Sequence, residues 1–279
     1  MNYKLQRWVP KKILTRMIGL LSHLPLGWIS HLWIKIFISR YKVNMNEAIY
    51  PDVKSYHCFA EFFSRALKHN IRHIDQRSWL VMSPVDGSIA EYGSIKCNSI
   101  IQAKHIDYTT QHLLASHKYQ KQLQNGSFIT FYLSPKDYHR IHMPISGTLR
   151  EMIYVPGNFY SVNTHSAENI PQLYCQNERV ICAFNTDAGL MLVVMVGAMI
   201  VGGIETPWHG RVKSNKYFHK HVMQWNYSDK KHHYKRGDEI GLFTIGSTVI
   251  VLFEHKEVEL SKHLQKNQSI QLGDQIAIT

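Results

Sequence analysis

The sequence predicts an α+β protein in which N-terminal amphipathic helices precede a mostly antiparallel β core. Two observations lead to this prediction. Apolar stretches of helical length occupy the first 40 residues, and after Trp79 the chain changes to short β-prone runs separated by Gly, Pro, Asn and Asp. With 279 residues, 44% of them hydrophobic, the chain is long enough to bury a sizeable core.

Residues 1–40 form the first predicted unit and combine apolar stretches with positive charge. The stretches Ile13–Leu24 and Leu26–Ile38 are separated by Pro25 and Gly27, which break helices. Each is too short to cross a hydrocarbon core of about 30 Å, but basic, tryptophan-containing helices suit the membrane interface. The alternative is that both helices pack on the protein's own core. The cations that precede the first acidic residue are Lys4, Arg7, Lys11, Lys12, Arg16, Lys35, Arg40 and Lys42.

The overall charge restricts the class of partner. Lys and Arg number 32 against 20 Asp and Glu, a formal net charge of +12 that predicts an anionic membrane or a nucleic acid. The N-terminal aromatic residues cluster with Leu and Ile and do not interleave with Arg, so we expect a membrane and no nucleic acid. No cleavable secretory signal is recognised and the four cysteines form no CxxC pair, which favours a cytosol-facing protein with reduced thiols.

Residues 41–279 form the second predicted unit. From Tyr41 to about Trp79 the mixed pattern predicts further helix, with Phe63 and Leu67 on one helical face. The most apolar run, Leu190–Val201, predicts a buried central strand. The other predicted strands are Ser88–Glu91, Ser127–Leu133, Gly147–Tyr154, Val180–Phe184 and Val249–Phe253.

Two stretches carry acidic or basic side chains. Residues 83–88, Ser-Pro-Val-Asp-Gly-Ser, are typical of a turn that enters a strand, and in a functional interpretation this turn holds Asp86 to orient a distant histidine. Residues 131–144 carry His139 and His142, without further ligands at metal-binding spacing, so we expect no metal. Residues three apart in extended chain face opposite sides, which predicts two different tasks. The alternative is a pair of loop histidines bonded to the backbone.

A third stretch, Gly246-Ser247-Thr248, lies between two apolar runs near the C-terminus. In a tight turn the Ser247 hydroxyl can attack the Gly246 carbonyl, because glycine has no side chain to block the approach. The alternative is an ordinary hairpin or bulge glycine. The GxSxG pattern of α/β-hydrolases is absent from this stretch.

In this order, the three stretches resemble the proenzyme of phosphatidylserine decarboxylase, of the bacterial membrane-associated type. The resemblance runs over nearly the whole chain, although many members have Leu where this chain has Ile245. Its motifs are the basic N-terminus, Phe62-Phe63-Ser64-Arg65, Ser83–Gly87, Phe131–Pro144, Val196-Gly197-Ala198, Gly203-Ile204-Glu205-Thr206 with Trp208, and Gly246-Ser247-Thr248-Val249.

The resemblance implies decarboxylation of phosphatidylserine to phosphatidylethanolamine. The cofactor would be a pyruvoyl group made from Ser247, with neither pyridoxal phosphate nor a metal. Autocatalytic cleavage would leave a β chain that ends at Gly246 and an α chain of residues 247–279. By family correspondence, His142 is the base for cleavage and Asp86 orients it, while His139 supports substrate binding or proton transfer.

The resemblance also implies a peripheral protein on the cytoplasmic face of the inner membrane, attached through residues 1–40. Burial of Trp28 and Trp33 in a homodimer contact is an alternative. Two competing functions remain: a serine hydrolase that uses Asp86, His142 and Ser247 on an external ester, and a non-enzymatic basic membrane-binding module.

Overall fold

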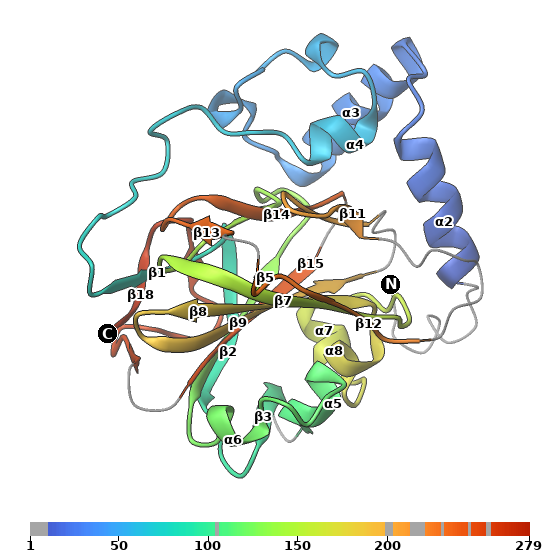
Figure 1. Ribbon diagram of the computed structural model, residues 1–279. Coiled ribbons are helices and arrows are strands. Elements are labelled where there is room, and N and C mark those ends of the chain that lie inside the picture. Colours follow the sequence, from blue (N-terminus) through green and yellow to red (C-terminus); the bar gives the residue numbers. More distant parts are fainter. Residues whose placement is uncertain are drawn as a thin grey trace.

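The computed structural model describes residues 11–103, 106–198, 203–212, 221–229, 232–244, 247–254 and 258–279. The N-terminal helices lie against one side of a β-rich body, and short helices lie on its far side (Figure 1). We call residues 11–63 the helical layer and the described residues from 80 onward the β core. Helices followed by mostly antiparallel sheets confirm the predicted α+β class.

The helical layer contains two longer helices and several short ones. They are α2 (Lys11–Ser22), α3 (Trp28–Tyr41), the 3₁₀ turns η1 (Met45–Glu47) and η2 (Val53–Ser55), and α4 (Phe59–Phe63). The helices on the far side of the β core are α5 (Thr110–Leu114), α6 (Gln120–Leu123), α7 (Thr164–Ala167) and α8 (Leu173–Gln176).

The largest described sheet is antiparallel and has nine strands. Its order is β12 (Met223–Asn226), β7 (Gly147–Val155), β8 (Arg179–Thr186), β9 (Gly189–Gly197), β15 (Ser247–Phe253), β5 (Ser127–Leu133), β2 (Gly87–Ser94) and β17 (Ser269–Ile270), with β13 (His233–Tyr234) also paired to β7.

Three smaller sheets surround the large one. Their orders are β11 (Gly210–Val212), β10 (Ile204–Thr206), β14 (Glu239–Phe243), β6 (Arg140–His142); β1 (Leu80–Met82), β18 (Gln275–Ile278), β16 (Glu259–Leu260); and β3 (Ser99–Ala103), β4 (Ile106–Thr109).

The centre of the large sheet is buried on both faces. Every residue of β15 and nearly every residue of β9 is buried, which explains why these strands have continuous apolar sequences instead of alternating ones. The six predicted strands are all present. The run from Leu190 is central as predicted and forms a strand as far as Gly197, while residues 199–201 lie outside the described part.

The predicted break between the first two helices is confirmed. Helix α2 ends at Ser22 and α3 begins at Trp28, and Gly27 between them adopts φ 58°, a left-handed conformation that glycine tolerates. Pro25 lies in the same break and has no N–H to donate to a preceding turn.

The predicted helix between Tyr41 and Trp79 is largely wrong. Helix α4 ends at Phe63, and the Ser64 hydroxyl donates a hydrogen bond to the Ala60 carbonyl at 2.9 Å. At Leu67 the chain already has an extended conformation, and Leu67 pairs with Ala48 in an isolated β-bridge. Phe63 and Leu67 therefore do not share a helical face, because pairing with a distant segment replaces the local hydrogen bonds.

The helical layer has a small aromatic core of its own. Phe59, Phe62 and Phe63 of α4 are buried with Ile34 of α3, and Trp33 stacks on Phe59 with ring centroids 4.3 Å apart. Among the described residues no helix combines the length and apolar character needed to cross a bilayer.

Candidate active site

Ser247 is the first residue of β15, an inner strand of the large sheet, and lies opposite Leu133 of β5 and Gly197 of β9. It is 1% exposed, and its Oγ has no hydrogen-bond partner among the described residues. A buried hydroxyl without a partner costs about 1–3 kcal/mol, but Thr130 and Thr248 share this property, so it does not by itself set Ser247 apart. Gly246, the other half of the predicted cleavage site, lies outside the described residues.

Asp86 directly precedes β2. Strand β2 begins at the end of the sheet where β5 terminates and β15 starts. Strand β2 is two strands away from β15, about 10 Å at the usual strand spacing. Gly87 packs so closely on β5 that a Cβ atom there would lie 2.4 Å from the Tyr132 carbonyl oxygen. The tight Asp-Gly turn thus fixes Asp86 at the same end of the sheet as Ser247.

The Asp86 carboxylate is held by an arginine. Arg72 donates from Nε to Oδ1 at 3.0 Å and from Nη2 to Oδ2 at 2.5 Å, and the Leu272 amide donates to Oδ1 at 2.8 Å. Arg72 also bonds Glu47 of η1 at 2.7 Å. Hydrogen bonds to the two carboxylates raise the pKa of Arg72, which therefore stays charged.

His142, the last residue of β6, has both ring nitrogens occupied. Nδ1 donates to the Gly237 carbonyl at 2.7 Å, which leaves Nε2 to accept from the Tyr138 hydroxyl at 2.9 Å. Burial lowers the pKa of His142, while Glu239 and Asp86 act in the opposite direction by favouring the imidazolium. Its amide donates to the Pro84 carbonyl at 2.9 Å, which ties β6 to the turn that carries Asp86.

His139 is fully buried and has one open nitrogen. Nδ1 donates to the Asp137 carbonyl at 2.8 Å, and Nε2 has no partner among the described residues. Its ring packs on Phe63 of the helical layer at 4.1 Å. Burial, together with the Arg65 charge, lowers the pKa of His139 to about 3, so the imidazole is neutral at physiological pH and Nε2 is an acceptor.

The strand register separates the two histidines along the path to Ser247. Strand β14 runs toward Ser247, and His142 lies opposite its first residue, Glu239. The carbonyl of His139 accepts from the amide of its last residue, Phe243, at 3.0 Å. His139 is thus at the Ser247 end of β6, and His142 is at the end tied to the Asp86 turn.

The predicted triad is not connected by hydrogen bonds in this structure. Among the described residues, no bond joins Asp86 to His142, and Ser247 bonds neither. The predicted residues occupy one region, but Arg72 holds Asp86 and Tyr138 holds His142. The sequence reasoning did not identify Arg72, and no local pattern marks it, because its partner is set by the fold.

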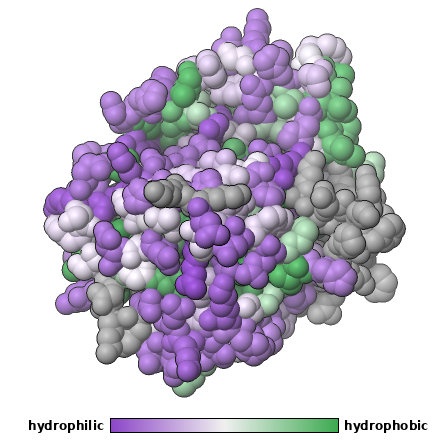
Figure 2. All heavy atoms as spheres, viewed as in Figure 1, coloured by the Kyte–Doolittle hydropathy of each residue, from purple (hydrophilic) through white to green (hydrophobic). Residues whose placement is uncertain are grey.

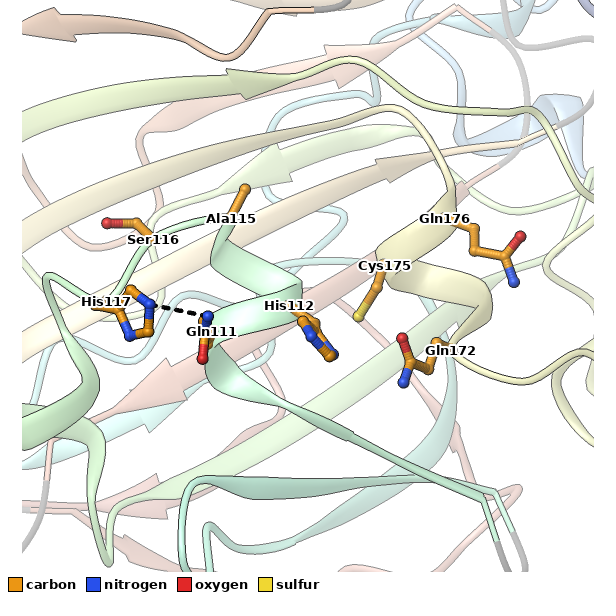
Figure 3. A pocket seen from close by; sticks show the side chains of 8 residues that line it. All are labelled: Gln111, His112, Ala115, Ser116, His117, Gln172, Cys175 and Gln176. Atoms are coloured by element: carbon orange, nitrogen blue, oxygen red, sulfur yellow. Dashed lines mark hydrogen bonds between the residues drawn. The ribbon is translucent and has the colours of Figure 1, made fainter.

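A cavity of about 450 Å³ lies between α5 and α8, and none of the predicted site residues lines it. Glutamine and histidine side chains line it, and Gln111 bonds His117 at 2.9 Å (Figure 3). Among the described residues, no three potential metal ligands cluster in this cavity or elsewhere.

Comparisons with known proteins agree on one family. Residues 59–278 match the family model described as phosphatidylserine decarboxylase, and residues 2–42 match a model described as PSD. The chain is 46% identical to the phosphatidylserine decarboxylase proenzyme of Hamiltonella defensa, over 98% of this chain and 96% of the relative. It is 42% identical to the proenzyme of that name from Coxiella burnetii (98% and 96%) and from Vibrio parahaemolyticus (98% and 97%).

Proposed function

The chain belongs to the phosphatidylserine decarboxylase family and converts phosphatidylserine to phosphatidylethanolamine, and we propose that Ser247 supplies the pyruvoyl group on which this pyruvoyl-dependent family relies. The observation that carries the proposal is the place of Ser247 at the start of β15, at the end of the sheet where the Asp86 turn also lies, with a buried hydroxyl that has no partner among the described residues. A pyruvoyl group needs no metal and supplies an electrophilic carbonyl that draws electrons from the carbon losing carbon dioxide.

The group arises from the chain by a balanced rearrangement. The Ser247 oxygen attacks the Gly246 carbonyl carbon, the peptide C–N bond breaks, and an ester joins the two residues. Loss of the Ser247 α-proton and of the ester oxygen from Cβ then releases a β chain that ends in the Gly246 carboxylate. Water replaces the remaining nitrogen, which leaves as ammonia, and the α chain begins with a pyruvoyl group.

We propose His142 as the base that takes the Ser247 hydroxyl proton, with Asp86 as its supporting carboxylate. A base must hold a positive charge briefly. Burial and Arg140 oppose that charge on His142, while the Gly237 carbonyl, Glu239 and Asp86 favour it. The Tyr138 hydroxyl has to release Nε2 before the proton is taken. His139 is less suited to this step, although its Nε2 is open, because burial and Arg65 both oppose a charge there.

His139 fits a role in substrate binding. Its Nδ1–H is fixed on the Asp137 carbonyl, so Nε2 presents a lone pair inside a buried site. We propose that this lone pair accepts a hydrogen bond from the serine amino group of the lipid, which places the amine for reaction.

The two cleavage products should stay together as one enzyme. Strand β15 lies between β5 and β9, and the α chain also supplies β16, β17 and β18, which pair within the described sheets. Scission before Ser247 removes one peptide bond but leaves these strand pairings in place.

We further propose that the helical layer attaches the enzyme peripherally to an anionic membrane on the cytoplasmic face. Large apolar side chains of α2, α3 and the turn between them are exposed, namely Met17, Leu20, Leu21, Leu24, Leu26, Trp28, Ile29, Leu32 and Ile36. Hydrophobic residues gather at the edge where α2 and α3 meet (Figure 2). Exposed Lys35 and Arg40 on α3 add positive charge for anionic headgroups.

Intact-mass measurement of the purified chain tests the proposed processing. We expect two chains divided between residues 246 and 247, with the short chain lighter by one ammonia than a serine-terminated chain. Ser247→Ala should give one uncut and inactive chain. Thr248→Val is the matched control, because Thr248 is equally buried and its hydroxyl also lacks a partner among the described residues. Cleavage in Ser247→Ala, or an active uncut wild-type chain, would contradict the proposal.

A further inference from the structure

Arg65 is a buried cation without a carboxylate partner among the described residues. It is 5% exposed, and Nη2 donates to the Lys136 carbonyl at 2.9 Å and more weakly to the Asp137 carbonyl at 3.4 Å. Its Nε and Nη1 have no partner in the described part of the chain and no accessible surface, so an anion reaches them only when the side chain turns toward the cavity. Burial of a charged guanidinium with unused donors is costly, so the position suggests that an anion completes it.

Arg65 lines a cavity of about 240 Å³ whose acidic groups are already bonded. Arg72 holds both Asp86 and Glu47, while Asp137 accepts from the amide and hydroxyl of Ser134. The other lining cations, Lys42 and Lys136, are exposed and form no salt bridge within the described residues. The charge left over in the cavity is therefore positive.

The cavity is lined by residues of the helical layer and by Asp86, one of the candidate site residues. Lys42 directly follows α3, the helix proposed to lie on the membrane. Arg65 and His139 donate to the same Asp137 carbonyl oxygen, so their side chains are neighbours, although His139 does not itself line the cavity. A headgroup that enters from the membrane would pass Lys42 and reach Arg65 beside His139.

We propose that Arg65, assisted by Lys42 and Lys136, binds the phosphodiester of the substrate lipid. This inference rests on the proposed function, since it assigns the substrate to the same site. The serine carboxylate is the poorer candidate, because a cation that holds the departing carboxylate stabilises the ground state more than the transition state. The phosphodiester keeps its charge throughout the reaction, so binding it does not oppose loss of carbon dioxide. Arginine also matches phosphate oxygens with paired donors.

Direct binding to the full-length Ser247→Ala chain tests the proposal without any turnover. The probes are glycerophosphoserine, glycerophosphoethanolamine, inorganic phosphate and O-methyl-serine, titrated by calorimetry. In this background we expect Arg65→Met to weaken both glycerophosphodiesters about 10- to 100-fold, the range for a lost charge-assisted hydrogen bond, and to leave O-methyl-serine unchanged. Arg65→Lys should retain part of the affinity.

The ethanolamine probe separates the two anions of the headgroup, because it has a phosphodiester and no carboxylate. If Arg65→Met weakens glycerophosphoserine but not glycerophosphoethanolamine, Arg65 binds the carboxylate and the proposal is wrong. Tighter binding of inorganic phosphate than of glycerophosphoserine would also contradict it. Arg77→Met is the matched control, since that arginine is 56% exposed and paired with Asp75, and it should change no affinity.

A structural role for Arg65 is tested in the cleavable chain. Arg65→Met should still cleave itself, and its KM for soluble phosphatidylserine should rise more than its kcat falls. If Arg65→Met fails to fold, the double variant Lys42→Gln/Lys136→Gln decides, because both side chains are exposed. The double variant should weaken both glycerophosphodiesters, and unchanged affinities would refute the proposal. If the wild-type chain does not cleave itself, the proposed function is refuted, but these binding results remain valid.

Discussion

The helical layer and the β core place apolar side chains in opposite environments. In β15 every side chain is buried, including Ile250 at 0% exposure, whereas on α3 the side chains of Trp28 and Ile36 are 73% and 59% exposed. The β core buries its own apolar surface through strand pairing and sheet packing. The helical layer has an aromatic core around Phe59 but leaves its outer surface uncovered, as expected for a surface that meets lipid.

Under the proposed function, the chemistry and the membrane attachment belong to separate parts of the chain. Ser247, His142 and Asp86 all belong to the β core, while the exposed apolar residues belong to the helical layer. Substitutions on the outer face of α3 should therefore change membrane binding and leave cleavage intact. Arg65 follows the last helix of the layer and contacts the β core, so it lies where the two regions meet.

The largest expected effect comes from the β core. His142→Ala should abolish self-cleavage, whereas His139→Ala should cleave and then turn over at least 100-fold more slowly. Because burial lowers the pKa of His142, its neutral, basic form persists to lower pH. The cleavage rate should therefore fall with acidification only below the ordinary histidine value of about 6.5. Gel assays over a pH series measure the cleavage rate. If the His142→Ala chain still cleaves itself, His142 is not the base.

The next test compares two isoleucines. Ile250→Ala in β15 should lower the free energy of unfolding by about 2–5 kcal/mol, since it leaves a cavity in a packed sheet. Ile36→Ala on α3 should change it by less than about 0.5 kcal/mol, because most of that side chain is already in water. Urea unfolding in the Ser247→Ala background measures both on an intact chain. Equal losses would show that the outer face of α3 is packed against protein.

Sequence patterns were most informative where local and global preferences agree. The strands were predictable because a buried central strand must be apolar throughout, and the Pro25–Gly27 break because both residues prevent helix continuation. The family motif predicts Asp86, His139, His142 and Ser247 as site residues, but it could not show which groups each one bonds.

The features that the sequence did not predict depend on contacts between distant segments. Arg72 meets Asp86 only because the chain after α4 folds back along the β core, and nothing near Arg72 in the sequence signals this. The helix expected beyond Phe63 ends early, because Leu67 pairs with Ala48. Trp33 and Phe37 resemble Trp28 in sequence context, yet they face Phe59 and the layer's own core.

Two tryptophans of α3 sharpen the comparison within the helical layer. Trp28→Ser should weaken binding to vesicles containing anionic lipid about 10- to 100-fold at every salt concentration, because burial of an apolar side chain is not screened. Trp33→Ser should instead lower stability by about 2 kcal/mol, since its ring stacks on Phe59. Vesicle sedimentation and urea unfolding measure the two effects. Equal vesicle binding by Trp28→Ser and the wild type would mean that Trp28 does not enter lipid.

The smallest expected effect tests the charge of the helical layer. Lys35 is exposed on α3, and a cation near an anionic surface contributes about 1 kcal/mol, so Lys35→Gln should weaken vesicle binding about fivefold at low salt. The loss should shrink as salt rises, because the Debye length falls from about 30 Å at 0.01 M to about 3 Å at 1 M. Lys121→Gln is the matched control, since Lys121 is exposed on α6 across the β core from the helical layer (Figure 1). If both substitutions weaken binding equally, the attraction comes from the net charge of +12 and not from the helical layer.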